Sequence, residues 1–255
     1  MKKINIFANW KMYLDYDESN ILANALLEKA KDLPENIQIT LFPSALALYP
    51  IVQTFSGDNL AVGAQNAYWI EKGGYTGEIS MQMYKDAGCK FILIGHSERR
   101  HIFNETNHEV RQKIEAALSL GLTPVICVGE TQEERKSNKT EEVVEVQLRA
   151  AFDGLTVAEG TEIFVAYEPV WAIGTGEACA AGEAERMHAI IDRIVKALIP
   201  NAKLSILYGG SVRADIVADY LVGPATDGVL VGNASAKLES ISDIIDRVIA
   251  VATAK

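Results

Sequence analysis

The feature that most constrains the fold of this chain is an apolar, β-branched run of residues that recurs eight times. Successive runs begin about 32 residues apart between Ile4 and Gly228. Most are continuous rather than alternating, which is typical of parallel strands buried on both faces. The eight predicted strands are Ile4–Ala8, Ile37–Phe42, Leu60–Ala64, Phe91–Gly95, Thr123–Val128, Ile163–Tyr167, Leu204–Tyr208 and Gly228–Val231.

Segments with helical periodicity separate these runs. Apolar residues recur at steps of three and four from Met187 to Leu198 and again from Leu238 to Ile249. Thr106 and Glu109 have the spacing of a capping box, which predicts that a helix begins there. Strands that alternate with helices predict a parallel sheet covered by helices. Eight such units in 255 residues predict an α/β fold, a (β/α)8 barrel that forms a single domain over residues 1–255.

An open doubly wound sheet is the alternative that the same alternation allows. Its glycine fingerprint follows the first strand, and this chain has Asn9-Trp10-Lys11-Met12 at that place. The chain also has no linker rich in Pro, Gly or Ser and no low-complexity segment, so a single domain is the simplest interpretation.

Composition limits the partners and the location that we expect. The formal net charge of −10 argues against a broad surface for nucleic acid or an anionic membrane, although a small anionic ligand remains possible. Three sparse cysteines, Cys89, Cys127 and Cys179, predict reduced thiols of a cytosolic protein. The amino terminus is too polar for a signal peptide, and no apolar run approaches the ~18 residues of a membrane span. We therefore predict a cytoplasmic location.

In a barrel of this kind, chemistry belongs at the carboxyl ends of the strands. Lys11 is there either a solvated loop lysine or a fixed cation for a phosphate or an oxyanion. His96 is either structural or a hydrogen-bond donor to a carbonyl, and a helix that begins near Ser97 would disfavour its imidazolium form. Glu168 is either a surface carboxylate or one that points out of the barrel mouth, since Pro169 keeps it extended.

Two kinds of loop suggest how a ligand would be held. The segment Pro169–Gly176 is apolar between two hinges, which fits a lid or ordinary packing under a helix. Glycine-bearing turns follow the last two predicted strands, at Gly209–Ser211 and at Gly232-Asn233, where barrels of this kind often bind phosphate.

Two further segments carry weaker signals. Residues 130–142 are crowded with both signs of charge and are interpreted as a solvated helix face. The loop from Tyr68 to Gly77 is long and rich in aromatic residues, which is typical of a contact with a partner.

Seven segments in order resemble the triosephosphate isomerase family: NWKM, VGAQN, YTGEIS, GHSERR, CVGE, AYEPVWAIGTG and YGGSV. The resemblance extends from end to end of the chain. It implies interconversion of D-glyceraldehyde 3-phosphate and dihydroxyacetone phosphate by proton transfer through an enediolate, without cofactor or metal. This reaction belongs to glycolysis and gluconeogenesis.

The resemblance also implies a role for each matching residue. Glu168 matches the catalytic base, His96 the neutral electrophile, and Asn9 and Lys11 the groups that contact the substrate oxygens. Gly174, Ser211, Gly232 and Asn233 match the phosphate-binding residues. The lid would comprise Pro169, Val170, Trp171, Ala172, Ile173, Gly174 and Thr175. Thr76 matches the loop tip that contacts the second subunit of a homodimer.

Some positions depart from the family pattern, and two other functions stay open. Ala8, Tyr13, Asn233 and the second lid hinge Glu177-Ala178-Cys179 differ from the usual residues. An aldolase or another phosphosugar enzyme would favour a Schiff-base lysine inside a strand, and the eight predicted runs contain none. A non-catalytic homologue would lack Glu168, His96 or Lys11, and all three are present.

Overall fold

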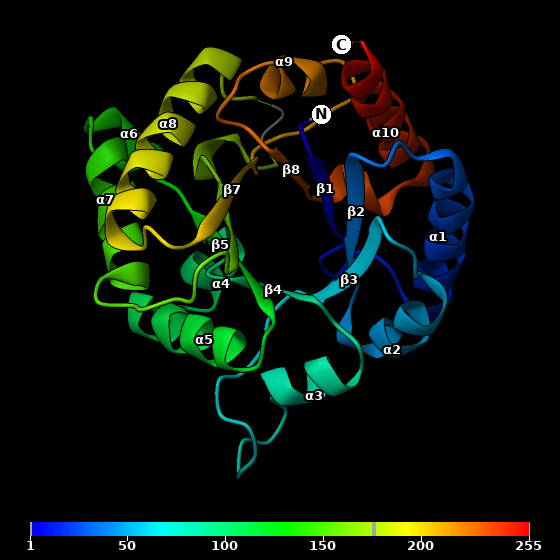
Figure 1. The fold of residues 1–255 in the computed structure, drawn as a ribbon, viewed down its shortest axis with the longest axis horizontal. Helices are drawn as coiled ribbons and strands as arrows, with labels where there is room; N and C mark the ends of the chain where they lie inside the picture. Colours follow the sequence, from blue (N-terminus) through cyan, green and yellow to red (C-terminus); the bar gives the residue numbers. More distant parts are fainter. Residues whose placement is uncertain (1, 175–176, 255) are drawn as a thin grey trace.

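The eight predicted strands form a closed parallel barrel (Figure 1). The computed structural model describes residues 2–174 and 177–254. The first strand pairs with both the second and the last, so the sheet has no edge and the open doubly wound alternative is wrong. The strands are β1 Ile4–Asn9, β2 Ile37–Phe42, β3 Leu60–Ala64, β4 Phe91–Ile94, β5 Thr123–Val128, β6 Glu162–Tyr167, β7 Lys203–Tyr208 and β8 Gly228–Val231.

The predicted strand boundaries differ from the observed ones by at most one residue. One difference brings a lysine into a strand, because β7 begins at Lys203. That side chain is exposed and donates to Glu162 Oε1 at 2.7 Å, at the amino end of the neighbouring strand β6. No other described strand contains a lysine, so the barrel interior holds no candidate for a Schiff base.

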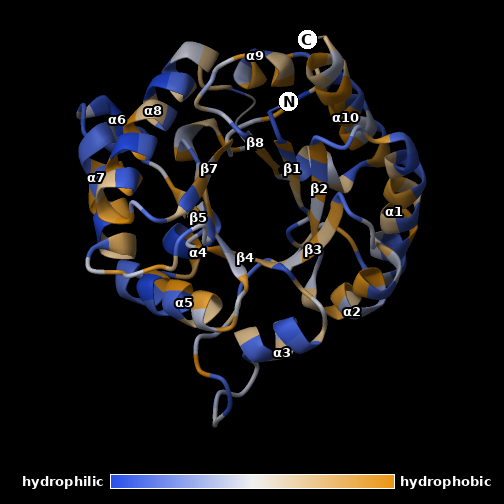
Figure 2. Ribbon diagram, viewed as in Figure 1, coloured by the Kyte–Doolittle hydropathy of each residue, from blue (hydrophilic) through white to orange (hydrophobic). Residues whose placement is uncertain are grey.

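Helices surround the barrel as a ring (Figure 1). Figure 2 shows hydrophobic and hydrophilic residues mixed along them, as expected for helices with one face on the barrel and the other in water. The predicted capping box is present, and both predicted periodic segments are helical. The helices are α1 Tyr16–Lys29, α2 Ala45–Thr54, α3 Met81–Asp86, α4 Ser97–Ile102, α5 Asn107–Ser119, α6 Gln132–Lys136, α7 Thr140–Phe152, α8 Ala181–Leu198, α9 Val217–Leu221 and α10 Leu238–Thr253, with short 3₁₀ turns η1 Ala30–Asp32, η2 Val170–Ala172 and η3 Asn233–Ala236.

Aromatic side chains fill the inside of the barrel. The ring of Phe7 lies 5.6 Å from that of Phe42, 5.1 Å from Phe91 and 5.0 Å from Phe164. These buried side chains belong to one cluster with residues from other strands, and the cluster is separate from the larger core between strands and helices. Because the interior is packed, polar groups that act on a ligand must stand above this layer, at the ends of the strands.

His188 is fully buried in α8. Its Nδ1 lies 2.7 Å from the hydroxyl of Thr226, and that hydroxyl donates to Glu185 at 3.2 Å. Nδ1 therefore carries the hydrogen of the neutral ring, and the ring meets Tyr167 edge to face at 5.9 Å. Burial, with a smaller effect of Lys2, lowers the pKa of His188 from 6.5 to about 3. This histidine is a neutral part of the core.

We expect His188 to make the fold sensitive to acid. Below pH 6.5 the unfolded chain binds a proton at this site, whereas the folded chain does not until about pH 3, so stability falls as the pH falls. The loss is about 1.4 kcal/mol for each pH unit in that window. In His188→Gln, the free energy of unfolding from denaturant titrations at pH 7, 6 and 5 should fall less steeply by about that amount. His108→Gln, at an exposed site, is the control, and equal slopes for parent and His188→Gln would contradict the assignment.

Candidate active site

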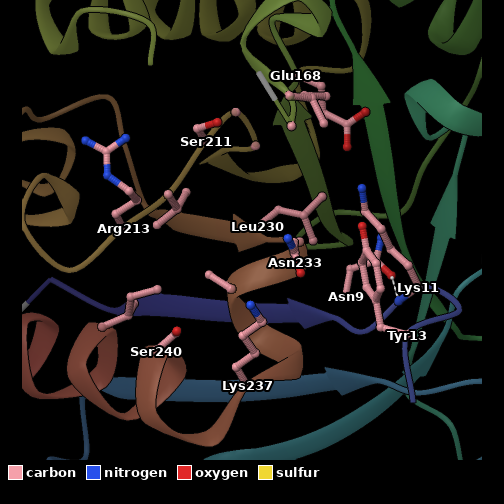
Figure 3. Close-up of a pocket in the computed structure, with 18 of the residues that line it drawn as sticks. Asn9, Lys11, Tyr13, Glu168, Ser211, Arg213, Leu230, Asn233, Lys237 and Ser240 are labelled. Carbon is pink, nitrogen blue, oxygen red and sulfur yellow. Dashed lines mark hydrogen bonds between the residues drawn. The ribbon is translucent and has the colours of Figure 1, made fainter. Parts of the chain in front are cut away.

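A cavity of about 540 Å³ opens at the carboxyl ends of the strands. Figure 3 shows side chains from well-separated parts of the chain that point into it. All eight residues predicted to act on the substrate or to bind phosphate line this cavity: Asn9, Lys11, His96, Glu168, Gly174, Ser211, Gly232 and Asn233. The barrel therefore brings together residues that lie up to 224 positions apart in the sequence.

The end of β1 places Lys11 in the cavity with an unusual backbone. Its φ of 49° lies in the left-handed region, which a lysine adopts only when its surroundings hold it there. The side chain of Asn9 accepts from the Lys11 amide at 3.0 Å, and Gln65 Nε2 donates to the Lys11 carbonyl at 2.8 Å. The ammonium group lies 2.6 Å from Glu98 Oε1. Lys11 is a fixed cation and not a solvated loop lysine.

His96 follows β4 and precedes the first residue of α4, so a helix does begin at Ser97. Its Nδ1 accepts from the Glu98 amide at 3.2 Å. In the neutral ring Nε2 must then carry the hydrogen, and Nε2 lies 3.2 Å from Glu168 Oε1. The ring thus presents an N–H donor to the cavity.

Glu168 stands directly after β6 with only 2% of its surface exposed, which excludes the interpretation as a surface carboxylate. Its Oε2 accepts from the Ser97 amide at 2.8 Å, while Oε1 faces His96. The Glu168 carboxylate is thus fixed at the wall of the cavity by the start of α4.

Backbone groups and cations surround the other end of the cavity. Gly232 and Asn233 follow β8 and begin η3, and Ser211 follows the turn after β7. Arg213 and Lys237 also line this part, as Figure 3 shows. Exposed amides together with cationic side chains form a suitable environment for an anion.

The predicted lid is hydrogen-bonded to Ser211, at this end of the cavity, and to the buried carboxylate of Glu130. The Ser211 hydroxyl donates to the Ala172 carbonyl at 2.5 Å. The indole of Trp171 donates to Glu130 Oε1 at 2.8 Å, and the guanidinium of Arg135 lies 4.1 Å from the centre of its ring. Thr175 lies outside the described residues.

Glu130 was predicted to lie on a solvated helix face, and that interpretation is wrong. The side chain is fully buried and accepts from the hydroxyl of Tyr167 at 3.1 Å as well as from Trp171. Glu130 lies two residues after β5, so the rule that chemistry belongs at the strand ends does point to this position. The charged residues that follow it in α6 favoured the other interpretation.

The second hinge of the lid is anchored by tyrosines. The Cys179 amide donates to the Tyr208 hydroxyl at 3.2 Å, and the Tyr220 hydroxyl donates to the Cys179 carbonyl at 2.6 Å. The two rings stack at 3.9 Å. The backbone of Cys179 is therefore held by two hydrogen bonds, and its side chain is buried. Glu177, at the start of the same hinge, is exposed.

The aromatic loop after β3 projects away from the barrel (Figure 1). Tyr68 packs against Trp69 and Tyr75, with ring centres 4.1 and 4.6 Å apart, and Thr76 at its tip is exposed. All three cysteines are buried and unpaired. None of the helices in residues 2–174 and 177–254 combines the length and the hydrophobicity that a membrane crossing requires.

We expect that a methyl group at Gly209 would disturb the site. A Cβ there would lie 2.9 Å from Glu168 Cγ and 3.3 Å from the Tyr167 carbonyl. Gly209→Ala should lower the free energy of unfolding by about 1–3 kcal/mol through overpacking, and a crystal structure of the variant should show Glu168 displaced from the Ser97 amide. Gly182→Ala, in α8 with open space around its Cβ, should instead leave the site unchanged and slightly raise stability. An undisturbed Glu168 in Gly209→Ala would refute this steric argument.

Comparison with known proteins agrees with this geometry. The family model described as triosephosphate isomerase matches residues 4–248. A triosephosphate isomerase of Dehalococcoides mccartyi is 42% identical over 247 residues, which cover 96% of each chain. Those of Dictyoglomus thermophilum and Carboxydothermus hydrogenoformans are 40% and 39% identical over 248 residues, which cover 96% of this chain and 99% and 98% of theirs. The chain belongs to the triosephosphate isomerase family.

Proposed function

We propose that this chain interconverts D-glyceraldehyde 3-phosphate and dihydroxyacetone phosphate, and that Glu168, His96, Lys11 and Asn9 carry out the reaction. The observation that supports these roles most directly is the placement of the Glu168 carboxylate 3.2 Å from the Nε2 of His96, with Lys11 lining the same cavity. Membership of the family supports the reaction itself, which is an isomerisation and a step of glycolysis.

The reaction needs one base, one hydrogen-bond donor and one cation. Glu168 removes a proton from the carbon next to the carbonyl of dihydroxyacetone phosphate, and the C–H electron pair becomes the C=C bond of an enediolate. The Nε2–H of His96 and the ammonium of Lys11 stabilise the negative charge that develops on oxygen. His96 then moves a proton between the two oxygens, and Glu168 returns its proton to the neighbouring carbon. The reaction moves only protons within one molecule, so it needs no redox partner.

The phosphate group would occupy the end of the cavity formed by Gly174, Ser211, Gly232 and Asn233. The family contact at Asn233 is a backbone amide, which asparagine supplies as well as glycine does. Binding energy from the phosphate supports chemistry at the carbonyl because it holds the reacting carbons against Glu168.

The lid, Pro169 to Thr175, would exclude water from the enediolate. Ile173 and Gly174 of the lid line the cavity, and the hydrogen bond from the Ser211 hydroxyl to the Ala172 carbonyl supports a connection between the lid and the phosphate end. A closed, dry site strengthens the electrostatic interactions and protects the intermediate from elimination of phosphate.

We further propose that residues 1–255 act as one catalytic domain in a cytoplasmic homodimer. Three buried, unpaired cysteines support a reducing compartment. The exposed aromatic loop around Thr76 supports a subunit contact, because rings such as Tyr75 would otherwise stay in water.

Replacement of the base should separate chemistry from folding. Glu168→Gln should lower kcat by roughly 10²–10⁴-fold, because an amide cannot accept the proton, while the unfolding midpoint changes little. His96→Gln should lose less, since its amide can still donate to the carbonyl oxygen. The measurement is a coupled assay with glyceraldehyde 3-phosphate, with circular dichroism as the control for folding. A Glu168→Gln variant within tenfold of the parent would mean that another group is the base.

A charge in the aromatic loop should separate the subunits. Thr76→Arg would bury an unpaired cation in the proposed contact, which costs far more than an exposed arginine. We expect light scattering to give the mass of a dimer for the parent and of a monomer for the variant. Lys72→Arg, which keeps the charge in the same loop, is the control. A dimeric Thr76→Arg protein would remove Thr76 from the interface.

A further inference from the structure

Gly95, the residue that precedes His96, is held by side chains at both its amide and its carbonyl. The amide of Gly95 donates to Glu105 Oε1 at 3.0 Å, and its carbonyl accepts from Arg100 Nε at 2.7 Å. Gly95 has a φ of 70°, in the region that favours glycine, and a Cβ there would lie 2.8 Å from a terminal nitrogen of Arg100. The direction in which the chain enters His96 therefore depends on these two side chains.

Arg100 extends this hold to the neighbouring elements. One terminal nitrogen donates to Asn107 Oδ1 at 2.7 Å, at the start of α5, and the other lies 3.3 Å from the Cys127 carbonyl in β5. The planar guanidinium thus spans the ends of β4 and β5, and a lysine could not bind all three acceptors at once.

The charge of Arg100 has no carboxylate within ion-pair distance in residues 2–174 and 177–254, unlike that of Arg99, which pairs with Glu105. All of its hydrogen-bond acceptors are neutral. Arg100 lines a small cleft with His101, Cys127 and Glu168. Burial lowers the pKa of the Arg100 guanidinium, and interactions with Cys127, Glu105 and Glu168 oppose that effect.

The other charges around His96 largely pair with one another. Glu98 lies 3.8 Å from Nδ1, but its other oxygen binds Lys11. Glu105 binds Lys113 and Arg99, and the charge on Lys113 faces Glu105 and Asn66 rather than the ring. Glu168 lies 3.2 Å from Nε2. Arg100 is the cation that lacks a carboxylate partner among these groups.

We propose that Arg100 is a positioning residue for His96, because its guanidinium holds the Gly95 carbonyl from which the chain continues into His96. The inference rests on the roles proposed above for His96 and Glu168. The fork to Gly95 and Cys127 fixes the place of the ring.

Two substitutions test the three hydrogen bonds of the Arg100 guanidinium. Arg100→Gln removes the guanidinium, and Arg100→Lys keeps the positive charge but cannot bind all three acceptors at once. Both variants should lower kcat by about ten- to a hundredfold with a smaller change in KM, because the phosphate-binding residues are not touched.

Arg111→Gln is the matched control. Arg111 also donates to two backbone carbonyls, those of Ala151 and Asp153, but on the outer helices. Arg111→Gln should lose stability but keep the kcat of the parent. A kcat within twofold of the parent in Arg100→Gln and Arg100→Lys would overturn the proposal, as would an equal loss of kcat in Arg111→Gln.

A spectroscopic readout does not depend on turnover. The ¹⁵N resonances of the His96 ring report the tautomer of the ring and the hydrogen bond that its Nδ1 accepts from the Glu98 amide. In both Arg100 variants these resonances should differ from those of the parent, because the ring is displaced, and in Arg111→Gln they should not. If Glu168→Gln and His96→Gln remained active, the proposed function would fail while these resonances could still be read. If the resonances were identical in parent and Arg100→Gln, the role of Arg100 would fail alone.

Discussion

Closure of the barrel is the constraint on which the rest of this structure depends. Once β8 pairs with β1, the carboxyl ends of eight strands share one rim, and residues as distant as Asn9 and Asn233 line one cavity. The packing of Phe7 against rings from three other strands fills the space below. A filled interior leaves the rim as the place where polar side chains meet a ligand, and the loops can vary around a rigid support.

The rim holds ionisable side chains close together and largely out of water. Glu168 and His96 are both almost fully buried and face one another, with Ser97 and Glu98 supplying backbone donors to each. Short helix α4 begins at this point, so two amides of its first turn are used by the site itself. Lys11 is held in a strained backbone conformation by Gln65 and Asn9. Strain of this kind persists only where several contacts determine the position together.

The lid is connected to the barrel through polar groups that are buried beneath it. Glu130 receives hydrogen bonds from Tyr167 in β6 and from Trp171 in the lid, and Tyr208 in β7 receives one from the second hinge. These acceptors lie at or just beyond the ends of strands, so the two hinges are fixed to the same rim as Glu168 and His96. The substitution of the usual hinge residues by Glu177-Ala178-Cys179 leaves the hydrogen bonds of the Cys179 backbone in place, because they do not depend on its side chain.

The sequence by itself determined the fold and the residues at the ends of the strands. Continuous β-branched runs identify buried parallel strands, their number and spacing predict the barrel, and the ends of those runs locate His96 and Glu168. The tertiary structure alone decided what surrounds them. Glu130 is buried because Tyr167 and Trp171 converge on it, and Gln65 and Glu105 act through backbone groups of distant segments. The residues next to a charged side chain in the sequence are of the same kind whether that side chain is exposed to water or buried in such a network. What distinguishes the two cases is contacts with distant segments, and these exist only after the barrel has closed.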